Sequence, residues 1–364
     1  MKRFPLCALA AGAAALVTQL VAVDAMAQGV KDQLGTVTKK PDEEGRPAWM
    51  KKMAGSSVDL SSYIGSGSFY ASNYHNPYVS MAVFVRPTYD LGTRFKLSAN
   101  ARLYVEEELT MPDVPNGRRF SPYDIWLWLS AKDLHTFAGP KIRLGGVARL
   151  VVPISYESRY AHMVTGTAAG LSLTRPFEFG SAPTAEGRWN LVAVVSSVFT
   201  KYFYTSDLRG DPPGDSTGCR PFVPGGLAAG SAGGATASEG DRCGGPVNTN
   251  FALTTSGTLS LTHGKWNLAV IMLVANSFRY RVAENVAANL PESAIGRSDT
   301  TWGIVSLTYS FTDHLGVSVG LSSYQPALDS QYRRLRFPFF DTDVSGSAVA
   351  NNYTQAFVSL SGTL

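Results

Sequence analysis

The chain carries a repeated alternation of apolar and polar residues over segments of about ten residues. The clearest is 95–108, FKLSANARLYVEEE, where every second residue from Phe95 to Val105 is apolar and most of the residues between them are polar. Segments 141–152 and 250–262 repeat this pattern. Successive side chains of a β-strand point to opposite faces of its sheet, so each segment predicts a strand with one apolar and one polar face.

Segments of this kind fill most of the chain after residue 56. Counting them gives twelve predicted strands, and no segment between them has a sustained helical period. The predicted strands are 57–70, 78–89, 95–107, 123–131, 141–152, 167–178, 188–202, 250–262, 266–279, 300–311, 315–324 and 352–364.

The connections between the predicted strands alternate in length. Such alternation is typical of bacterial membrane barrels, which have short periplasmic turns and long extracellular loops. An even number of strands also returns the C-terminus to the periplasmic side. The short connections are 90–94, 132–140, 263–265 and 312–314, and the long ones are 108–122, 153–166, 203–249, 280–299 and 325–351.

The low content of charged residues indicates that the apolar strand faces contact lipid rather than water. Charged residues make up 16% of the chain, against about 25% in an average soluble domain. Beyond the N-terminal segment, no window offers the 18 or so consecutive apolar residues of a spanning helix. A membrane protein with this sequence must therefore span as a closed sheet, since an open sheet leaves unpaired backbone groups in lipid.

We therefore predict an all-β fold, a transmembrane antiparallel up-and-down β-barrel of about 12 strands, with lipid outside and a polar lumen inside. Ten and fourteen strands are the alternatives. The connection before Tyr78 is short for an extracellular loop, and the connection 179–187 is long for a periplasmic turn.

The N-terminus predicts export. Residues 1–27 combine a short basic start, a mostly apolar segment and the small-residue sequence Ala25-Met26-Ala27, which is typical of a cleaved signal peptide. The alternative is a transmembrane anchor, but Thr18, Gln19 and Asp24 interrupt the apolar segment. Cys7 lies inside that segment rather than after a lipobox-like end, which argues against lipid anchoring.

The mature chain is expected to begin at Gln28 and to keep 30 basic and 27 acidic residues. Nothing in this balance predicts binding to nucleic acid. Residues 28–55 are predicted to form a solvated periplasmic tail, with a plug or a partner contact as the alternative. Residues 56–364 form the predicted barrel, with its longest extracellular loop at 203–249.

Aromatic residues gather near both predicted ends of the strands. Two girdles at the membrane interfaces would explain both groups, because these rings have an apolar body and a polar edge. The alternative is the general abundance of aromatic residues near strand ends in β proteins. The inner group is Tyr89, Phe95, Phe137, Trp189, Trp266 and Phe311, and the outer group is Tyr70, Tyr104, Tyr123, Tyr202, Phe278, Trp302, Tyr324 and Tyr353.

The last segment, 353–364, YTQAFVSLSGTL, resembles the terminal strand of outer-membrane β-barrels, which acts as an assembly signal and ends in an aromatic residue. Here the final residue is Leu364, a departure from that pattern. The resemblance implies location in a Gram-negative outer membrane, contact with its lipid and recognition by the barrel-assembly machinery. No motif names one family within this class.

Cys219 and Cys243 are the two cysteines that remain after signal cleavage, and both lie in the longest loop. An exported pair of cysteines predicts a disulfide bond. Closing a loop of about 25 residues would stabilise the fold by about 3 kcal/mol, with a rigid exposed lid as the functional alternative. Two cysteines without nearby histidines do not supply the usual four zinc ligands, so no metal or other cofactor is predicted.

An enzyme is the least favoured class. None of the five histidines stands two residues before a serine on one predicted strand, where a base and a nucleophile would lie side by side. The best candidate is His162, which shares a loop with Glu157 and Ser158. Glu106, Glu107 and Glu108 suggest either a cation site or, more simply, a rim of ion pairs with Arg118 and Arg119.

The remaining place for function is the predicted lumen. Twelve strands fall between small barrels with packed interiors and large barrels with aqueous channels. A basic lumen favours anions, and we expect a channel for small, anionic or amphiphilic solutes of unknown identity. The alternative is a non-conducting structural or surface-interaction barrel that acts through its loops. The charged residues predicted to line the lumen are Lys96, Arg102, Glu106, Lys141, Arg143 and Arg149.

Overall fold

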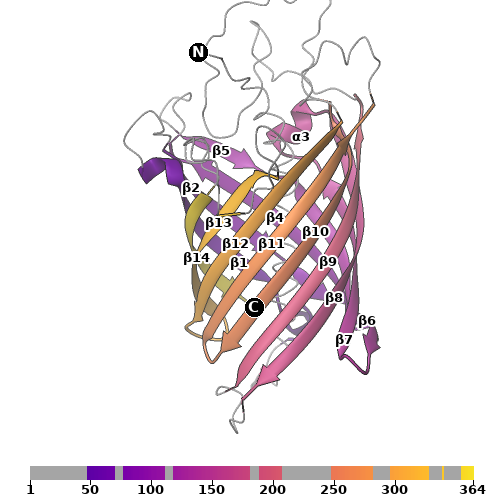
Figure 1. The fold of residues 1–364 in the computed structure, drawn as a ribbon, viewed down its shortest axis with the longest axis vertical. Helices are drawn as coiled ribbons and strands as arrows, with labels where there is room; N and C mark the ends of the chain where they lie inside the picture. Colours follow the sequence, from indigo (N-terminus) through magenta and orange to yellow (C-terminus); the bar gives the residue numbers. More distant parts are fainter. Residues whose placement is uncertain are drawn as a thin grey trace, which may run out of the picture.

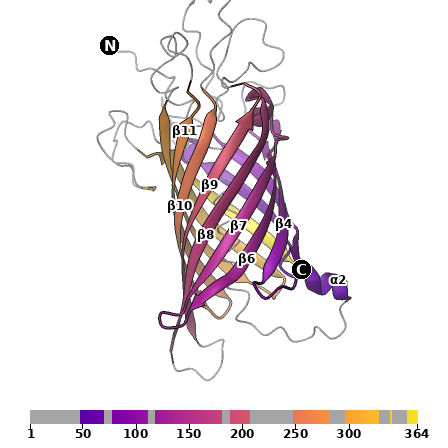
Figure 2. The same ribbon diagram turned by 90° about the vertical axis from the view of Figure 1, so that its right-hand side faces the viewer.

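The computed structural model describes residues 47–69, 77–110, 118–180, 188–206, 247–281, 296–327, 338–339 and 354–364. Within these residues the strands form one antiparallel sheet that closes on itself as a barrel, with strands tilted to the barrel axis (Figures 1 and 2). None of the helices in these ranges is both long and apolar enough to cross a membrane.

The barrel wall of the described residues has twelve strand positions. β2 and β3 are separated by Pro87, and both pair with β4, so together they fill one position. β5 and β6 both pair with the other side of β4, so they too fill one position. The strands are β1 (Ser57–Gly65), β2 (Val79–Arg86) with β3 (Thr88–Asp90), β4 (Leu97–Glu108), β5 (Arg119–Pro122) with β6 (Ile125–Phe137), β7 (Ile142–Val152), β8 (Met163–Phe179), β9 (Trp189–Tyr204), β10 (Thr249–His263), β11 (Trp266–Arg279), β12 (Arg297–Ser310), β13 (Leu315–Pro326) and β14 (Thr354–Thr363).

Each strand pairs with its neighbours in sequence order, and the first and last strands close the ring. β1 pairs with β14 over Ser57–Gly65 and with β2 on its other side, and β2 pairs with β4. Closure leaves the described wall no free edge, so backbone groups in the wall bond to a neighbouring strand. The predicted up-and-down barrel of twelve strands is confirmed.

All twelve predicted strands are present. Their ends differ, and the short strand β5 lies in what was predicted as the connection 108–122. β6 continues past residue 131 to Phe137 through a register shift between Ala131 and His135. β8 begins at Met163, four residues before its predicted start, because the preceding loop is shortened by the helix α3 (Tyr156–Tyr160). Ser155 caps this helix by accepting a hydrogen bond from the backbone N–H of Ser158.

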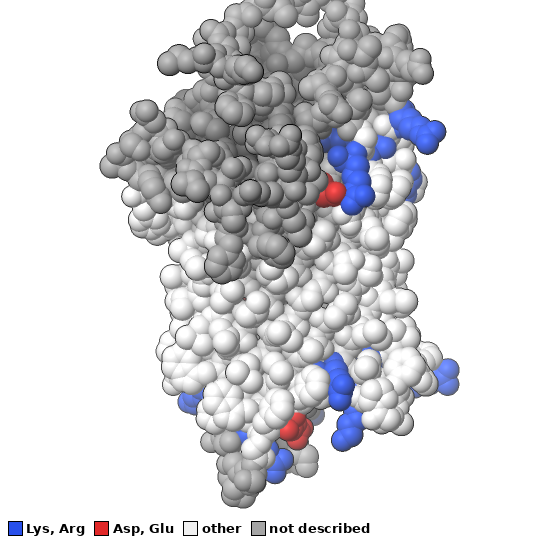
Figure 3. All heavy atoms as spheres, viewed as in Figure 1, with Lys and Arg blue, Asp and Glu red and all other residues white. Residues whose placement is uncertain are grey.

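The two faces of the wall are the reverse of those in a soluble protein. Along β4 the buried residues are Ser98, Asn100, Arg102, Tyr104 and Glu106, whereas the apolar residues between them lie on the outside. Figure 3 shows charged residues near the two ends of the barrel and an uncharged band between them on the face in view. An exterior of this kind is stable in lipid and not in water.

The inner end of the barrel carries the predicted aromatic girdle. Tyr89, Phe137, Trp189, Trp266 and Phe311 are all exposed, at the strand ends that the short turns join. Phe95 lies in the turn before β4 and is half-buried. These rings suit the interface between lipid headgroups and hydrocarbon.

The predicted outer girdle is wrong for most of its members. Tyr104, Tyr202 and Trp302 are buried, with 5%, 3% and 3% of their surfaces exposed, and pair with inward-facing residues of the adjacent strands. Tyr324 pairs with Trp302 on the same inner face. Tyr70 and Tyr353 lie outside the described residues. Strand parity, not closeness to a strand end, decides which way these rings point.

Both ends of the described barrel meet at its inner rim. The short helix α2 (Ala48–Lys52) leads into β1, and the backbone N–H of Gly55 donates to the carbonyl of Leu364 at 3.4 Å. In return, the N–H of Leu364 donates to the carbonyl of Ser56 at 3.0 Å. Figure 2 shows α2 beside the C-terminus. The predicted signal peptide, 1–27, and most of the predicted tail lie outside the described residues.

The orientation of the wall predicts a depth-dependent cost for charge on its outer face. Leu171, midway along β8, is 58% exposed, and Phe179, at the inner end, is 50% exposed. We expect Leu171→Arg to lower the free energy of unfolding in lipid vesicles by about 2–4 kcal/mol, and Phe179→Arg by at most about 1 kcal/mol. Leu171→Ala controls for lost side-chain volume. Equal costs for the two arginines would contradict the membrane position assigned to the wall.

Candidate functional site

The outer half of the lumen wall is rich in aromatic side chains. We call Tyr104, Trp126, Tyr202, Trp302 and Tyr324 the lumen aromatic group, because all five point inward from the outer halves of their strands. Phe84 on β2 stacks on Tyr104, with ring centroids 4.2 Å apart. The lumen therefore contains apolar surface although most of its wall is polar.

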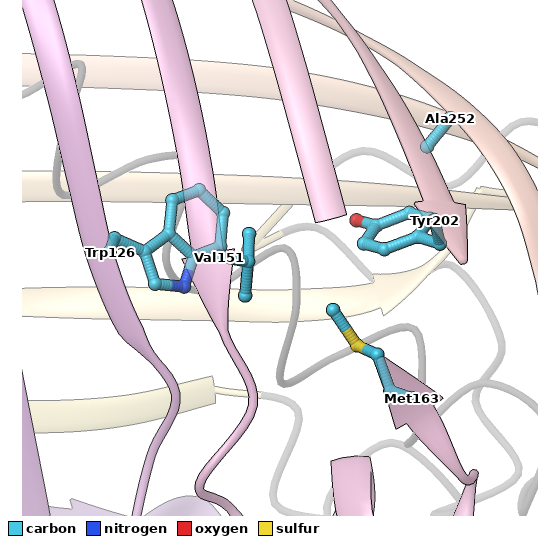
Figure 4. Close-up of a cluster of buried hydrophobic side chains, with 5 residues drawn as sticks. All are labelled: Trp126, Val151, Met163, Tyr202 and Ala252. Carbon is cyan, nitrogen blue, oxygen red and sulfur yellow. The ribbon is translucent and has the colours of Figure 1, made fainter. Parts of the chain in front are cut away.

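Three apolar clusters lie on the inner wall of the described residues. One contains Phe84 and Tyr104 together with Ala82, and the other two lie on further strands. The first of these two joins Trp126 and Val151, which face each other across β6 and β7, with Met163, Tyr202 and Ala252 (Figure 4). The second joins Ile271, Leu273, Ala275 and Trp302 from β11 and β12, with Ile304 and Tyr324 packed against it. Inward-facing apolar residues in a membrane barrel do not contact lipid, so these clusters present their surface to the lumen or to one another.

Elsewhere the wall is lined by hydroxyl groups. Several of them pair across neighbouring strands, and each pair satisfies polar atoms that a buried wall would otherwise leave unbonded. The pairs are Ser196 with Ser256 at 2.8 Å, Thr308 with Ser318 at 2.8 Å, Ser98 with Ser130 at 2.8 Å and Ser61 with Ser359 at 2.9 Å.

Glu106 is held by three phenols. The hydroxyls of Tyr78, Tyr104 and Tyr123 donate to its carboxylate oxygens at 2.5, 2.7 and 2.7 Å. Burial first, and then the charge of Glu106, raise the pKa of the Tyr78 and Tyr123 phenols, which lie just outside the strands, well above their ordinary value. Both phenols therefore stay protonated and continue to donate. This predicted lumen carboxylate is fixed in the wall.

Asp59, another buried carboxylate of the wall, forms an ion pair with Arg86 on the adjacent strand. Arg102 is 1% exposed, and its guanidinium lies 5.5 Å from the ring centre of Phe84 and 5.3 Å from that of Tyr104. Contacts of this kind between a cation and an aromatic face are attractive. Arg102 thus lies inside the barrel, on the face that the alternation of β4 predicts.

Arg149 has a different environment. Its guanidinium lies 4.3 Å from the ring centre of Trp126, and the residue is 6% exposed. Within the described residues, its Nε and Nη1 have no hydrogen-bond partner, and neither does the indole Nε1 of Trp126. The described residues also show no ion pair for Arg149. A buried arginine with unbonded donors is costly unless something else binds it.

The other three predicted lumen cations lie at the inner end. Lys96 and Lys141 are in turns with φ values of 51° and 55°, just before β4 and β7, and are exposed rather than lumen-lining. The Lys96 ammonium lies 3.4 Å from a carboxylate oxygen of Asp133. Arg143 faces inward opposite Thr174, close enough to Asp133 for their charges to attract. The two lysines were misplaced because each immediately precedes its strand, in a turn with positive φ that does not continue the alternation.

The histidine loop does not bring a base to a nucleophile. The hydroxyl of Ser158 donates a hydrogen bond to one carboxylate oxygen of Asp124 at 2.5 Å. The other carboxylate oxygen of Asp124 accepts from the backbone N–H groups of Ile154 and Ser155. His162 follows α3 and is exposed. These bonds hold the loop against the outer end of β6. At the neighbouring rim, Arg118 lies 3.8 Å from Glu107, as expected for an exposed ion pair.

Cys219 and Cys243 lie outside the described residues, so their predicted disulfide stays a prediction. In the described part of the chain, no three His, Cys, Asp or Glu side chains are grouped as a metal site would require.

No protein-family model matches the chain, and no curated protein sequence matches it. Solved structures to which it is similar include an outer membrane channel from Pseudomonas putida F1, at 10% identity over 90% of this chain and 100% of that chain, with a TM-score of 0.45. Another is outer membrane phospholipase A from Escherichia coli, at 10% identity over 90% and 94% of the two chains, with a TM-score of 0.31. At these values the likeness concerns the fold alone.

Closure of the wall, its apolar outer band and its inner aromatic girdle make this chain a bacterial outer-membrane β-barrel. Among the described residues the lumen combines hydroxyl groups, aromatic rings and three buried arginines, Arg86, Arg102 and Arg149. Sequence alternation placed Arg102, Glu106 and Arg149 on inward faces. Four members of the lumen aromatic group were instead predicted to form an outer girdle at the membrane interface, namely Tyr104, Tyr202, Trp302 and Tyr324, and Trp126 was not predicted as a site residue. Tyr104 shares a strand face with Arg102 and Glu106, and that parity was the available signal.

The three-phenol arrangement predicts a structural role for Glu106. We expect Glu106→Ala to lower the free energy of unfolding by at least about 2 kcal/mol, because three hydroxyls lose their shared acceptor. Glu107→Ala, on the outer face of the same strand, should change it by at most about 0.5 kcal/mol. Urea unfolding in lipid vesicles measures both values. A cost for Glu106→Ala no larger than that of its neighbour would refute the structural role.

Proposed function

We propose that this barrel is a narrow channel for small solutes and that it prefers anions. The observation that carries the proposal is the position of Arg149, a buried, inward-facing cation without an ion pair among the described residues. Arg102 adds a second buried cation across β6. Positive charge at the wall of a pore attracts anions and repels cations.

The surrounding wall supports this preference. Two buried carboxylates of the region are engaged, Asp59 by Arg86 and Glu106 by three phenols, so neither is directed at Arg149. The hydroxyl pairs on β9, β10, β12 and β13 give a permeating solute polar contacts along the remaining wall. Small inward-facing serines also leave more room than large side chains would.

A second candidate function is a non-conducting barrel that acts through its extracellular loops. The observation in its favour is the deep burial of several inward-facing side chains, among them Trp126, Arg102 and Leu273, each at most 2% exposed. Such burial is typical of a filled lumen. The proposal assigns the chain no catalytic activity, and the engagement of Ser158 with Asp124 supports that part of it.

Single-channel recording of the refolded mature chain in planar bilayers tests the proposal. We expect discrete conductance steps and, in a KCl gradient, a reversal potential that shows chloride preference. Arg149→Ala should lower the chloride-to-potassium permeability ratio about fivefold, since a unit charge a few Å from an ion in water contributes about 1 kcal/mol.

Arg143→Ala is the matched control, because it removes an arginine from the same strand that lies near Asp133. We expect a smaller change in selectivity for this variant. A folded, heat-modifiable barrel without conductance would refute the channel and favour the second candidate. An open pore whose selectivity is the same with and without Arg149 would refute the role of that residue.

A further inference from the structure

The donors around Arg149 are of the kind that bind anions. Two of the three guanidinium nitrogens and the indole N–H of Trp126 have no hydrogen-bond partner among the described residues, although Arg149 is only 6% exposed. Leaving such donors unbonded costs free energy, and an oxyanion would satisfy them. Guanidinium groups bind carboxylates especially well, through short, charge-assisted hydrogen bonds.

Arg102 lies on the other side of the same strand. In the register of the sheet Arg102 is opposite Trp126, and Arg149 is opposite Trp128, so two adjacent inward positions of β6 lie between the two arginines. The two guanidinium charges are close enough to repel each other. Arg102 therefore adds to the positive potential around Arg149.

Apolar side chains adjoin these donors directly. Trp126, which stacks beneath the Arg149 guanidinium, also belongs to the cluster with Val151, Met163 and Tyr202 (Figure 4). A hydrated inorganic anion gains nothing from such a wall. A molecule with an apolar body and one carboxylate gains both from the donors and from the rings.

We infer that the Arg149 guanidinium and the indole N–H of Trp126 form a binding site for the carboxylate of an amphiphilic monocarboxylate, whose aromatic or alkyl body packs on the Trp126 cluster. The inference rests on the proposed function only in that the solute must reach the lumen. It names the class of solute that the channel retains, rather than anions in general.

Equilibrium binding to the full refolded chain in detergent micelles tests the site without requiring conduction. The probe is 4-fluorophenylacetate, followed by fluorine NMR, with 4-fluorophenylacetamide as its uncharged counterpart. We expect saturable binding of the acid, weak competition by acetate, and at least about tenfold weaker binding of the amide. The amide also measures partition into the micelle.

Arg149→Ala should weaken binding of the acid at least about tenfold, because it removes the charge-assisted hydrogen bonds. Trp126→Phe keeps a ring in the cluster but removes the N–H, and should weaken binding by a smaller factor. Arg143→Ala is the control and should bind as the unchanged protein does. If Arg149→Ala does not give a heat-modifiable barrel, Arg149→Lys and Trp126→Phe replace it, because both keep much of the side-chain volume.

Equal affinity for the acid and the amide, or no loss of affinity in any variant at positions 149 and 126, would overturn the site. Conductance with chloride preference but without saturable binding of the acid would also overturn it, while the channel proposal would stand. Saturable, Arg149-dependent binding in a protein that does not conduct would support the site and refute the channel.

Discussion

The structure depends on one constraint: in hydrocarbon, every backbone N–H and C=O of the spanning segments must be bonded within the protein. Twelve antiparallel strand positions meet it by closing the sheet, with β1 bonded to both β14 and β2 and with β2 bonded to β4. Because the sheet is closed, successive side chains along each strand point alternately to the lipid and to the lumen. A residue such as Leu171 must then be apolar, whereas its inward neighbours are free to be small or polar.

That freedom explains how the lumen differs from the core of a soluble protein. Hydroxyl groups pair across strands on much of the wall, Asp59 forms an ion pair with Arg86, and Glu106 accepts hydrogen bonds from three phenols. Some buried hydroxyls of the described residues, such as those of Ser57 and Ser80, lack a hydrogen-bond partner, but Arg149 combines two unbonded nitrogens with a positive charge, beside an unbonded indole N–H. Positions at which local rules are broken without compensation are those at which function is expected.

Much of the fold could be predicted from the sequence because strand alternation over ten residues is a strong signal, and it placed Arg102 and Arg149 on the inner face. It failed where a strand begins, at Lys96 and Lys141, and where both faces are apolar. Trp126 and Trp128 lie in the segment IWLWL, in which every residue is apolar, so the sequence does not show which residues face the lumen. The site therefore needed the register of β6 against β4 and β7, which no local pattern contains.

Labelling of single cysteines on β7 tests most directly the central claim, that the face bearing Arg149 borders a solute-accessible lumen. Val147 points inward opposite Gly170, and Ala148 points outward and is exposed. In intact proteoliposomes, a small membrane-impermeant anionic thiol reagent should modify Val147→Cys and leave Ala148→Cys unmodified. Modification of Ala148→Cys alone would contradict the assigned faces, and modification of neither would contradict an accessible lumen.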